Sequence, residues 1–231
     1  MPPLRGQRNG AAMKKKVLIG FYILIVLIGL AVFMTANGFQ GKNAQAVQAG
    51  EKVYKQQCAI CHGDNGKGEG ANAGTSLNSQ VFLSSASDDD LVNYIAEGRP
   101  EAAMPAYGPR LSKEELKNVV AFIRDWQKGE MKFDVPDPIA GNAETGEKIY
   151  KRSCIQCHGE GGAGKPKMGT VLAHPNYLKY STDQQIWINT AYGRENTRMA
   201  PSLKGLDGVR QLSKKDISDV VAYIRSLEKE E

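Results

Sequence analysis

Two stretches of this 231-residue chain follow one pattern: GEKVYKQQCAICHG at residues 50–63 and GEKIYKRSCIQCHG at residues 146–159. Laid over each other at an offset of 96 residues, they match from the opening glycine to the glycine after the histidine. Together they contain all four cysteines of the chain. One pattern that occurs twice, this far apart, predicts two similar domains, because a solenoid would need three or more short repeats.

The similarity continues beyond these two stretches. The further matches are Ala96–Arg99 with Ala191–Arg194, Met104 with Met199, and residues 119–124 (VVAFIR) with residues 220–225 (VVAYIR). The second copy holds about six extra residues between its methionine and its last helix. We therefore expect a basic extension (1–16), a transmembrane anchor (17–36), a linker (37–44), a first domain (45–128), a proline-rich linker (129–141) and a second domain (142–231).

An uncharged run of eighteen residues, Val17–Met34, precedes the repeats. At about 1.5 Å rise per residue, a helix of this length covers most of a roughly 30 Å hydrocarbon core. Because Lys14–Lys16 lie at its start and only Lys42 lies near its end, the positive-inside rule keeps the N-terminus in the cytoplasm. A cleaved signal peptide is the alternative, with Ala44–Ala46 as a small-x-small site. Both interpretations place the repeats on the periplasmic or extracytoplasmic side of the cytoplasmic membrane.

The net positive charge of the chain comes from its first 42 residues. The first 42 residues contain six Lys or Arg and no acid, whereas the remainder contains 24 basic and 25 acidic residues. The two repeats therefore lack the basic surface that nucleic-acid binding requires, and we expect no nucleic-acid partner.

Each repeat has the pattern of a small helical domain. Helices are expected over 45–57 and 142–153, each of which leads into a cysteine pair. Further helix starts are indicated at Ser87, Ser112, Ser181/Thr182 and Ser213, where cap residues precede helix-periodic apolar positions. No run alternates at a period of two, so the predicted fold class is all-α.

The chemistry is indicated by Cys-x-x-Cys-His, which is typical of covalent c-type haem attachment. The two thiols of each motif reach the two vinyl groups along one haem edge, and the histidine presents its imidazole to the iron. Three alternatives fit less well. A zinc ribbon needs its cysteine pairs 15–20 residues apart, a thioredoxin-like pair needs a βαβ context, and disulfides leave the histidine unexplained. The expected cofactor sites are Cys58, Cys61 and His62, and Cys154, Cys157 and His158.

On these motifs each repeat resembles a class I cytochrome c domain. The resemblance implies two covalently bound haem c groups, and an N-terminal helix that crosses a C-terminal helix through a glycine and an aromatic residue. At the crossing, Gly50 and Tyr54 would meet Val119 and Phe122, and Gly146 and Tyr150 would meet Val220 and Tyr223. It also implies a methionine as second iron ligand. Met104 follows His62 by 42 residues and Met199 follows His158 by 41. Met104 precedes a proline directly, whereas one residue separates Met199 from Pro201.

Other side chains compete with these assignments. Met131 lies in the linker, and Met168 and His174 follow His158 too closely. His174 has no counterpart in the first repeat and is interpreted as a surface or loop histidine. The matched Arg99 and Arg194 fit either a haem propionate or a solvated surface position.

The resemblance implies an electron-transfer protein in which no side chain acts as an acid, base or nucleophile. The leading hypothesis is a membrane-anchored di-haem cytochrome that carries single electrons between respiratory or photosynthetic redox partners. Those partners would be a quinol-oxidising complex, a terminal oxidase or a reaction centre. The alternative is an integral di-haem subunit of a quinol-oxidising bc-type complex or of a haem-copper oxidase. A di-haem peroxidase is disfavoured, because it needs a displaceable or histidine ligand at one haem.

Overall fold

The structure is a computed structural model that describes residues 22, 25, 43–69, 74–100, 103–205 and 211–228. Within these ranges the chain is helical, and its only β-pairing consists of isolated bridges between Arg99 and Met104 and between Lys165 and Gly169. The predicted all-α class is confirmed for the described residues. The predicted transmembrane segment lies outside them, apart from Tyr22 and Ile25. Among the described residues, no helix has the length and apolar character needed to cross a membrane.

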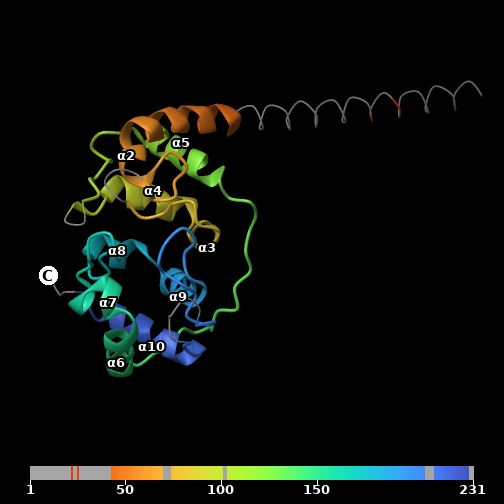
Figure 1. Ribbon diagram of the computed structural model, residues 1–231. Coiled ribbons are helices and arrows are strands. Elements are labelled where there is room, and N and C mark those ends of the chain that lie inside the picture. The colour runs from red at the N-terminus through yellow and green to blue at the C-terminus, as the bar shows by residue number, and fades with distance from the viewer. Residues whose placement is uncertain are drawn as a thin grey trace, which may run out of the picture. The chain divides into compact units, whose positions relative to one another are not determined.

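The first repeat is built from five helices among its described residues (Figure 1). They are a helix over 43–57, α2 (Ala59–His62), α3 (Gln80–Ser85), α4 (Asp88–Glu97) and α5 (Lys113–Arg124). The second repeat follows the same order. It has α6 (Ala143–Ser153), α7 (Ile155–His158), the short 3₁₀ helix η2 (Glu160–Gly162), α8 (Pro175–Tyr180), α9 (Asp183–Tyr192) and α10 (Lys214–Arg225).

Side-chain caps begin four of these helices where the sequence predicts. Ser87, Ser112, Thr182 and Ser213 each accept a hydrogen bond from the backbone N–H three residues later, and each forms a complete capping box. These bonds satisfy N–H groups that have no partner inside the helix. The sequence offers Ser181 or Thr182 as the start of α9, and the structure shows Thr182 as its cap.

The terminal helices of each repeat cross at a glycine, as the family resemblance implies. A Cβ atom on Gly50 would lie 1.8 Å from the carbonyl oxygen of Asn118, and one on Gly146 would lie 1.9 Å from that of Asp219. Aromatic pairs flank both crossings, with ring centroids 5.2 Å apart for Tyr54–Phe122 and 5.1 Å apart for Tyr150–Tyr223. Only glycine allows this approach of two helix backbones.

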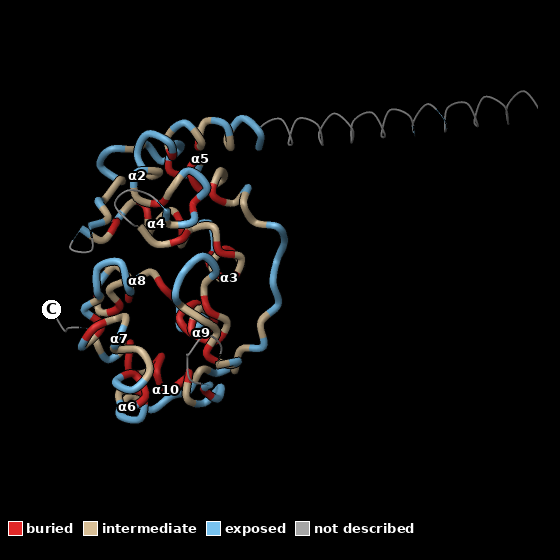
Figure 2. Tube along the Cα trace, viewed as in Figure 1, coloured by how far each residue is buried: buried red, intermediate tan, exposed pale blue. Residues whose placement is uncertain are grey.

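The proline-rich linker has a packed inner side. Phe133, Val135 and Ile139 lie against the hydrophobic core of the second repeat, and the Phe133 ring lies 4.9 Å from that of Tyr192. Figure 2 shows the linker as exposed or intermediate along its length. These contacts hold the linker against the second repeat.

The two repeats pack against each other, since the chain from Ala46 onward forms one compact unit. Helix α3 of the first repeat contacts α9 of the second, and α4 of the first contacts α8 of the second. In the repeat alignment α8 corresponds to α3, and α9 corresponds to α4. The interface therefore has approximate two-fold symmetry. Val81 of α3 belongs to the hydrophobic cluster of the second repeat.

Candidate cofactor sites

Each cysteine–histidine motif lies on a short helical turn of its own. Cys58 precedes α2, whose last residue is His62, and Cys154 precedes α7, whose last residue is His158. The backbone N–H of each histidine donates to the carbonyl of the first cysteine, at 2.9 Å in both repeats. The cysteines and the histidine that follows them are thereby held on a single turn of backbone.

All four cysteines are free and half-buried. Burial raises the pKa of the Cys58 thiol to about 11 and that of the Cys154 thiol to about 11, with the second cysteine of each motif adding to the rise. A redox-active Cys-x-x-Cys pair has the opposite property, a lowered thiol pKa. Among the described residues, no cluster of three His, Cys, Asp or Glu is arranged to hold a metal ion.

Each motif histidine is oriented by one backbone carbonyl. Nδ1 of His62 lies 2.8 Å from the carbonyl oxygen of Thr75, and Nδ1 of His158 lies 2.9 Å from that of Thr170. Because a carbonyl only accepts, Nδ1 carries the proton and Nε2 keeps its lone pair. Burial also lowers the pKa of both imidazoles and so favours the neutral form. A neutral imidazole with an oriented Nε2 is a good metal ligand.

A Gly-Thr pair packs against each motif, and the sequence analysis did not identify it. A Cβ atom on Gly74 would lie 2.9 Å from the carbonyl oxygen of Cys61, and one on Gly169 would lie 2.6 Å from that of Cys157. The glycines let the chain approach the motif, and the threonines that follow supply the carbonyls for the histidines. The signal was present, since Gly74-Thr75 and Gly169-Thr170 align at the offset of 95 that relates the methionines.

Met104 and Met199 lie in equivalent turns. The N–H of Arg99 donates to the Met104 carbonyl at 2.7 Å, and the N–H of Arg194 donates to the Met199 carbonyl at 2.8 Å. Both methionines are half-buried. Of the competing methionines, Met131 is 40% exposed and Met168 is 36% exposed.

The matched arginines cross the interface between the repeats. Arg99 donates from Nη1 to Oγ1 of Thr170 at 3.1 Å and lies 5.9 Å from the Tyr177 ring. Arg194 donates from Nη2 to the carbonyl of Ser76 at 2.7 Å and lies 4.1 Å from the Phe82 ring. Each side chain thus binds the opposite repeat, so the alternative of a solvated surface arginine is wrong at both positions.

The arginine pair fits the acidic groups of haem. Burial lowers the pKa of Arg99, and it lowers the pKa of Arg194 to about 10. No described Asp or Glu forms an ion pair with either guanidinium, and Nε of Arg194 is buried without a partner. Both residues are half-buried, and a cation removed from water is costly unless an anion compensates it. Haem propionates are anions of the right chemistry for such a position.

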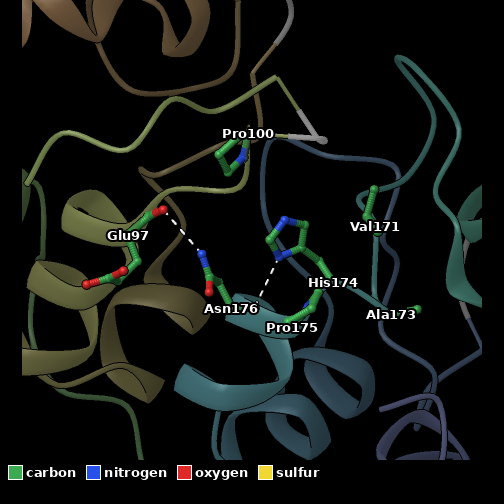
Figure 3. A pocket seen from close by; sticks show the side chains of 7 residues that line it. All are labelled: Glu97, Pro100, Val171, Ala173, His174, Pro175 and Asn176. Atoms are coloured by element: carbon green, nitrogen blue, oxygen red, sulfur yellow. Dashed lines mark hydrogen bonds between the residues drawn. The ribbon is translucent and has the colours of Figure 1, made fainter. Parts of the chain in front are cut away.

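His174 lies in the loop just before α8, as one part of its interpretation expects, but it is buried, so the other part, a surface histidine, is wrong. Its side chain is 6% exposed and accepts a hydrogen bond from the N–H of Asn176 at 3.1 Å as the cap of α8. It lines a cavity of about 440 Å³ together with Glu97, Pro100, Val171, Ala173, Pro175 and Asn176 (Figure 3). The Asn176 side chain also donates to the carbonyl of Glu97 at 3.2 Å. His174 therefore belongs to the interface between the repeats.

Two protein families match the chain, one for each repeat. Residues 45–123 match the family described as "Cytochrome C oxidase, cbb3-type, subunit III", and residues 143–228 match the family described as "Cytochrome c". The two matches cover the two regions in which the structure places a cysteine–histidine turn, a Gly-Thr pair and a methionine turn.

Curated relatives match both repeats together. The cbb3-type cytochrome c oxidase subunit FixP of Bradyrhizobium diazoefficiens is 28% identical over 194 residues, which are 80% of this chain and 62% of the relative. The corresponding subunit CcoP of Rhodobacter capsulatus is 27% identical over 193 residues, 78% of this chain and 61% of the relative. FixP of Azorhizobium caulinodans is 32% identical over 148 residues, 61% of this chain and 48% of the relative. The chain therefore spans about three fifths of the length of the first two relatives.

A solved structure shares the fold. It is titled "Kuenenia stuttgartiensis reducing HAO-like protein complex Kustc0457/Kustc0458", with a TM-score of 0.50 and 22% identity. The match covers 78% of this chain and 96% of that one. At this identity the likeness concerns the fold alone.

Proposed function

Because the chain carries two tandem domains of the cytochrome c family, we propose that it transfers single electrons as the di-haem subunit of a haem-copper oxidase. The observation that carries this proposal is the match of residues 45–123 to an oxidase-subunit family, together with relatives that bear oxidase-subunit names across both repeats. The alternative, an independent membrane-anchored carrier, has the same electron chemistry and differs in its assembly.

Four cysteines and two histidine–methionine pairs hold the cofactors in this proposal. The thiols of Cys58, Cys61, Cys154 and Cys157 would hold haem through thioether bonds. The iron ligands are His62 and Met104 in the first repeat, and His158 and Met199 in the second. Bound haem c supplies a reversible ferric–ferrous couple, whose potential His/Met ligation raises relative to two histidines.

The protein's own contribution is to fix this ligand set. Thr75 and Thr170 hold the imidazoles in one tautomer, as the distances of 2.8 Å and 2.9 Å from their carbonyls to Nδ1 support. With two protein ligands at each iron, small molecules have no easy entry. Arg99 and Arg194 would neutralise propionate charge at the interface between the repeats. None of these groups exchanges a proton with a substrate, so the chain itself is not the catalytic subunit.

We further propose that residues 17–36 anchor the chain in the cytoplasmic membrane, with its N-terminus inside and both haem domains outside. The domain boundaries stay those predicted, at 45–128 and 142–231. In this arrangement a donor protein or quinol-oxidising complex supplies electrons, and the oxidase core accepts them.

Co-purification tests the assembly. The protein is extracted from native membranes in mild detergent, and haem spectra are recorded across a gel-filtration profile. The oxidase-subunit proposal expects c-type absorbance to elute together with other haem types and with oxygen-reducing activity. Elution of all c-type absorbance alone, as a di-haem species, would instead support the independent carrier. A variant without Cys154 and Cys157 is the control: the c-type absorbance that decreases in its profile belongs to this chain.

A further inference from the structure

Three consecutive residues before Met199 bind the first repeat. Arg194 donates from Nη2 to the Ser76 carbonyl at 2.7 Å, and Asn196 donates from Nδ2 to the Asn78 carbonyl at 2.7 Å. Between them, the carboxylate of Glu195 accepts from the first repeat. The turn that carries Met199 is thus attached to the other repeat at three successive positions.

The Glu195 carboxylate accepts two hydrogen bonds through Oε2. One comes from the Ser79 hydroxyl, and the other comes from the backbone N–H of Val81 at 3.3 Å. Ser79 is fully buried, and Val81 lies in the hydrophobic cluster of the second repeat. Glu195 itself is exposed, but the two donors belong to buried residues. If the carboxylate were absent, these donors would lose this acceptor, which is more costly than the mean value of a hydrogen bond.

Hydrogen bonds within the turn connect these contacts to Met199. The Arg194 N–H donates to the Met199 carbonyl at 2.8 Å. The Thr197 hydroxyl donates to the Arg194 carbonyl at 2.7 Å and accepts from the Met199 N–H at 3.0 Å. Because the turn is closed on itself, a displacement at residues 194–196 displaces the methionine.

The position of the first repeat that aligns with Glu195 carries no carboxylate. At the offset of 95 that relates Met199 to Met104, Glu195 corresponds to Pro100, which has no side-chain acceptor. The first turn is instead attached to the second repeat by the Arg99 side chain and by Asn176, which donates to the Gly98 carbonyl at 3.0 Å. Among the described residues, a carboxylate contact of this kind to the other repeat is therefore found only at the second methionine turn.

We propose that Glu195 is a positioning residue through which the first repeat holds the Met199 turn, so that methionine ligation at the second haem depends on the docking of the first repeat. The inference rests on the proposed function, because it takes Met199 as an iron ligand. It goes further in stating that a contact made by one repeat sets the ligand strength at the haem of the other.

The test uses the full-length ferric holoprotein with Glu195→Ala, titrated with imidazole, which competes with methionine for ferric iron. The loss of the methionine-to-iron charge-transfer band reports displacement. The strongly shifted methyl resonances of ligated methionine, followed in the same ferric samples, distinguish the two haems once assigned with Met104→Ala and Met199→Ala. We expect imidazole to bind the second haem about tenfold more tightly, a change of about 1.4 kcal/mol, and the first haem with unchanged affinity.

Two further variants distinguish positioning from general damage. Glu195→Gln keeps an acceptor oxygen and is expected to restore most of the wild-type imidazole affinity. Ser79→Ala changes only the first repeat, yet it is expected to tighten imidazole binding at the second haem. Glu144→Ala, which removes an exposed carboxylate paired with Lys148 in the second repeat, is the matched charge control and should change neither haem.

The outcomes separate this inference from the proposed function. If Glu195→Ala leaves imidazole binding unchanged at the second haem while Met199→Ala abolishes its methionine signals, the positioning role is overturned and the ligand assignment stands. If Met199→Ala leaves those signals intact, the ligand assignment fails and the inference fails with it. Equal changes at both haems would also overturn the inference, because general loosening would then be the cause.

Discussion

Gly146→Ala tests the helix crossing on which the second repeat depends. The new Cβ atom would lie 1.9 Å from the Asp219 carbonyl oxygen and 2.9 Å from Cβ of Tyr223, whereas ordinary contact begins at 3.4 Å. Helices α6 and α10 must therefore separate by roughly 1.5 Å, since the nearest atom belongs to the backbone. Forced separation of packed elements costs about 1–3 kcal/mol, and a backbone clash belongs at the upper end of this range. The higher helix propensity of alanine stabilises the folded state by about 1 kcal/mol and offsets part of this cost.

The expected net loss is about 2 kcal/mol in the free energy of unfolding, measured by guanidinium denaturation of the holoprotein. Gly50→Ala, with a clash at 1.8 Å, should behave likewise in the first repeat. Gly129→Ala is the control, because a Cβ atom there would meet nothing within 4 Å, and it should change stability by less than about 0.5 kcal/mol. A stabilisation of about 1 kcal/mol by Gly146→Ala, as helix propensity alone predicts, would refute the crossing.

Three further changes test other parts of the account. Tyr150→Phe removes the 2.7 Å hydrogen bond to the buried Gly159 carbonyl and should cost about 1–2 kcal/mol in denaturant unfolding; unchanged stability would mean that the bond contributes nothing. Hydrogen bonds from Ser213 hold the pKa of Asp216 below its usual value, mainly the bond from the backbone N–H and then the bond from the hydroxyl. The stability that the ionised Asp216 provides is therefore present above about pH 4 and is lost as the pH falls through the lowered pKa. Asp216→Asn should accordingly flatten the acid side of the stability curve, and an unaltered slope would contradict this. Met199→Ala should abolish the methionine charge-transfer band and lower the reduction potential at one haem only, and a change at both haems or at neither would contradict the ligand assignment.

Features with a local cause could be predicted from the sequence. The capping boxes at Ser112 and Ser213 depend on residues three apart, and the helices begin there. The crossing at Gly50 followed from the family resemblance and is confirmed by the close approach to Asn118. The short helices α3 and α8 were missed, because six residues are too few for a 3.6-residue period to show.

Features that depend on the packing of the two repeats could not be predicted. The sequence shows that Arg99 and Arg194 match, but their partners Thr170 and Ser76 lie 71 and 118 residues away. His174 is polar and has no counterpart in the first repeat, which suggested exposure, yet its burial arises from the interface. The role of Glu195 was missed for the same reason, because its partner Ser79 is 116 residues distant.

The central claim is that each cysteine pair carries one covalently bound haem. The most direct test is the mass of the denatured full chain, produced in a host able to attach c-type haem, alongside Cys58→Ala/Cys61→Ala and Cys154→Ala/Cys157→Ala variants. The account predicts the mass of the polypeptide plus two haems, and plus one haem in each double variant. A chain that carries no haem after denaturation in such a host would contradict it.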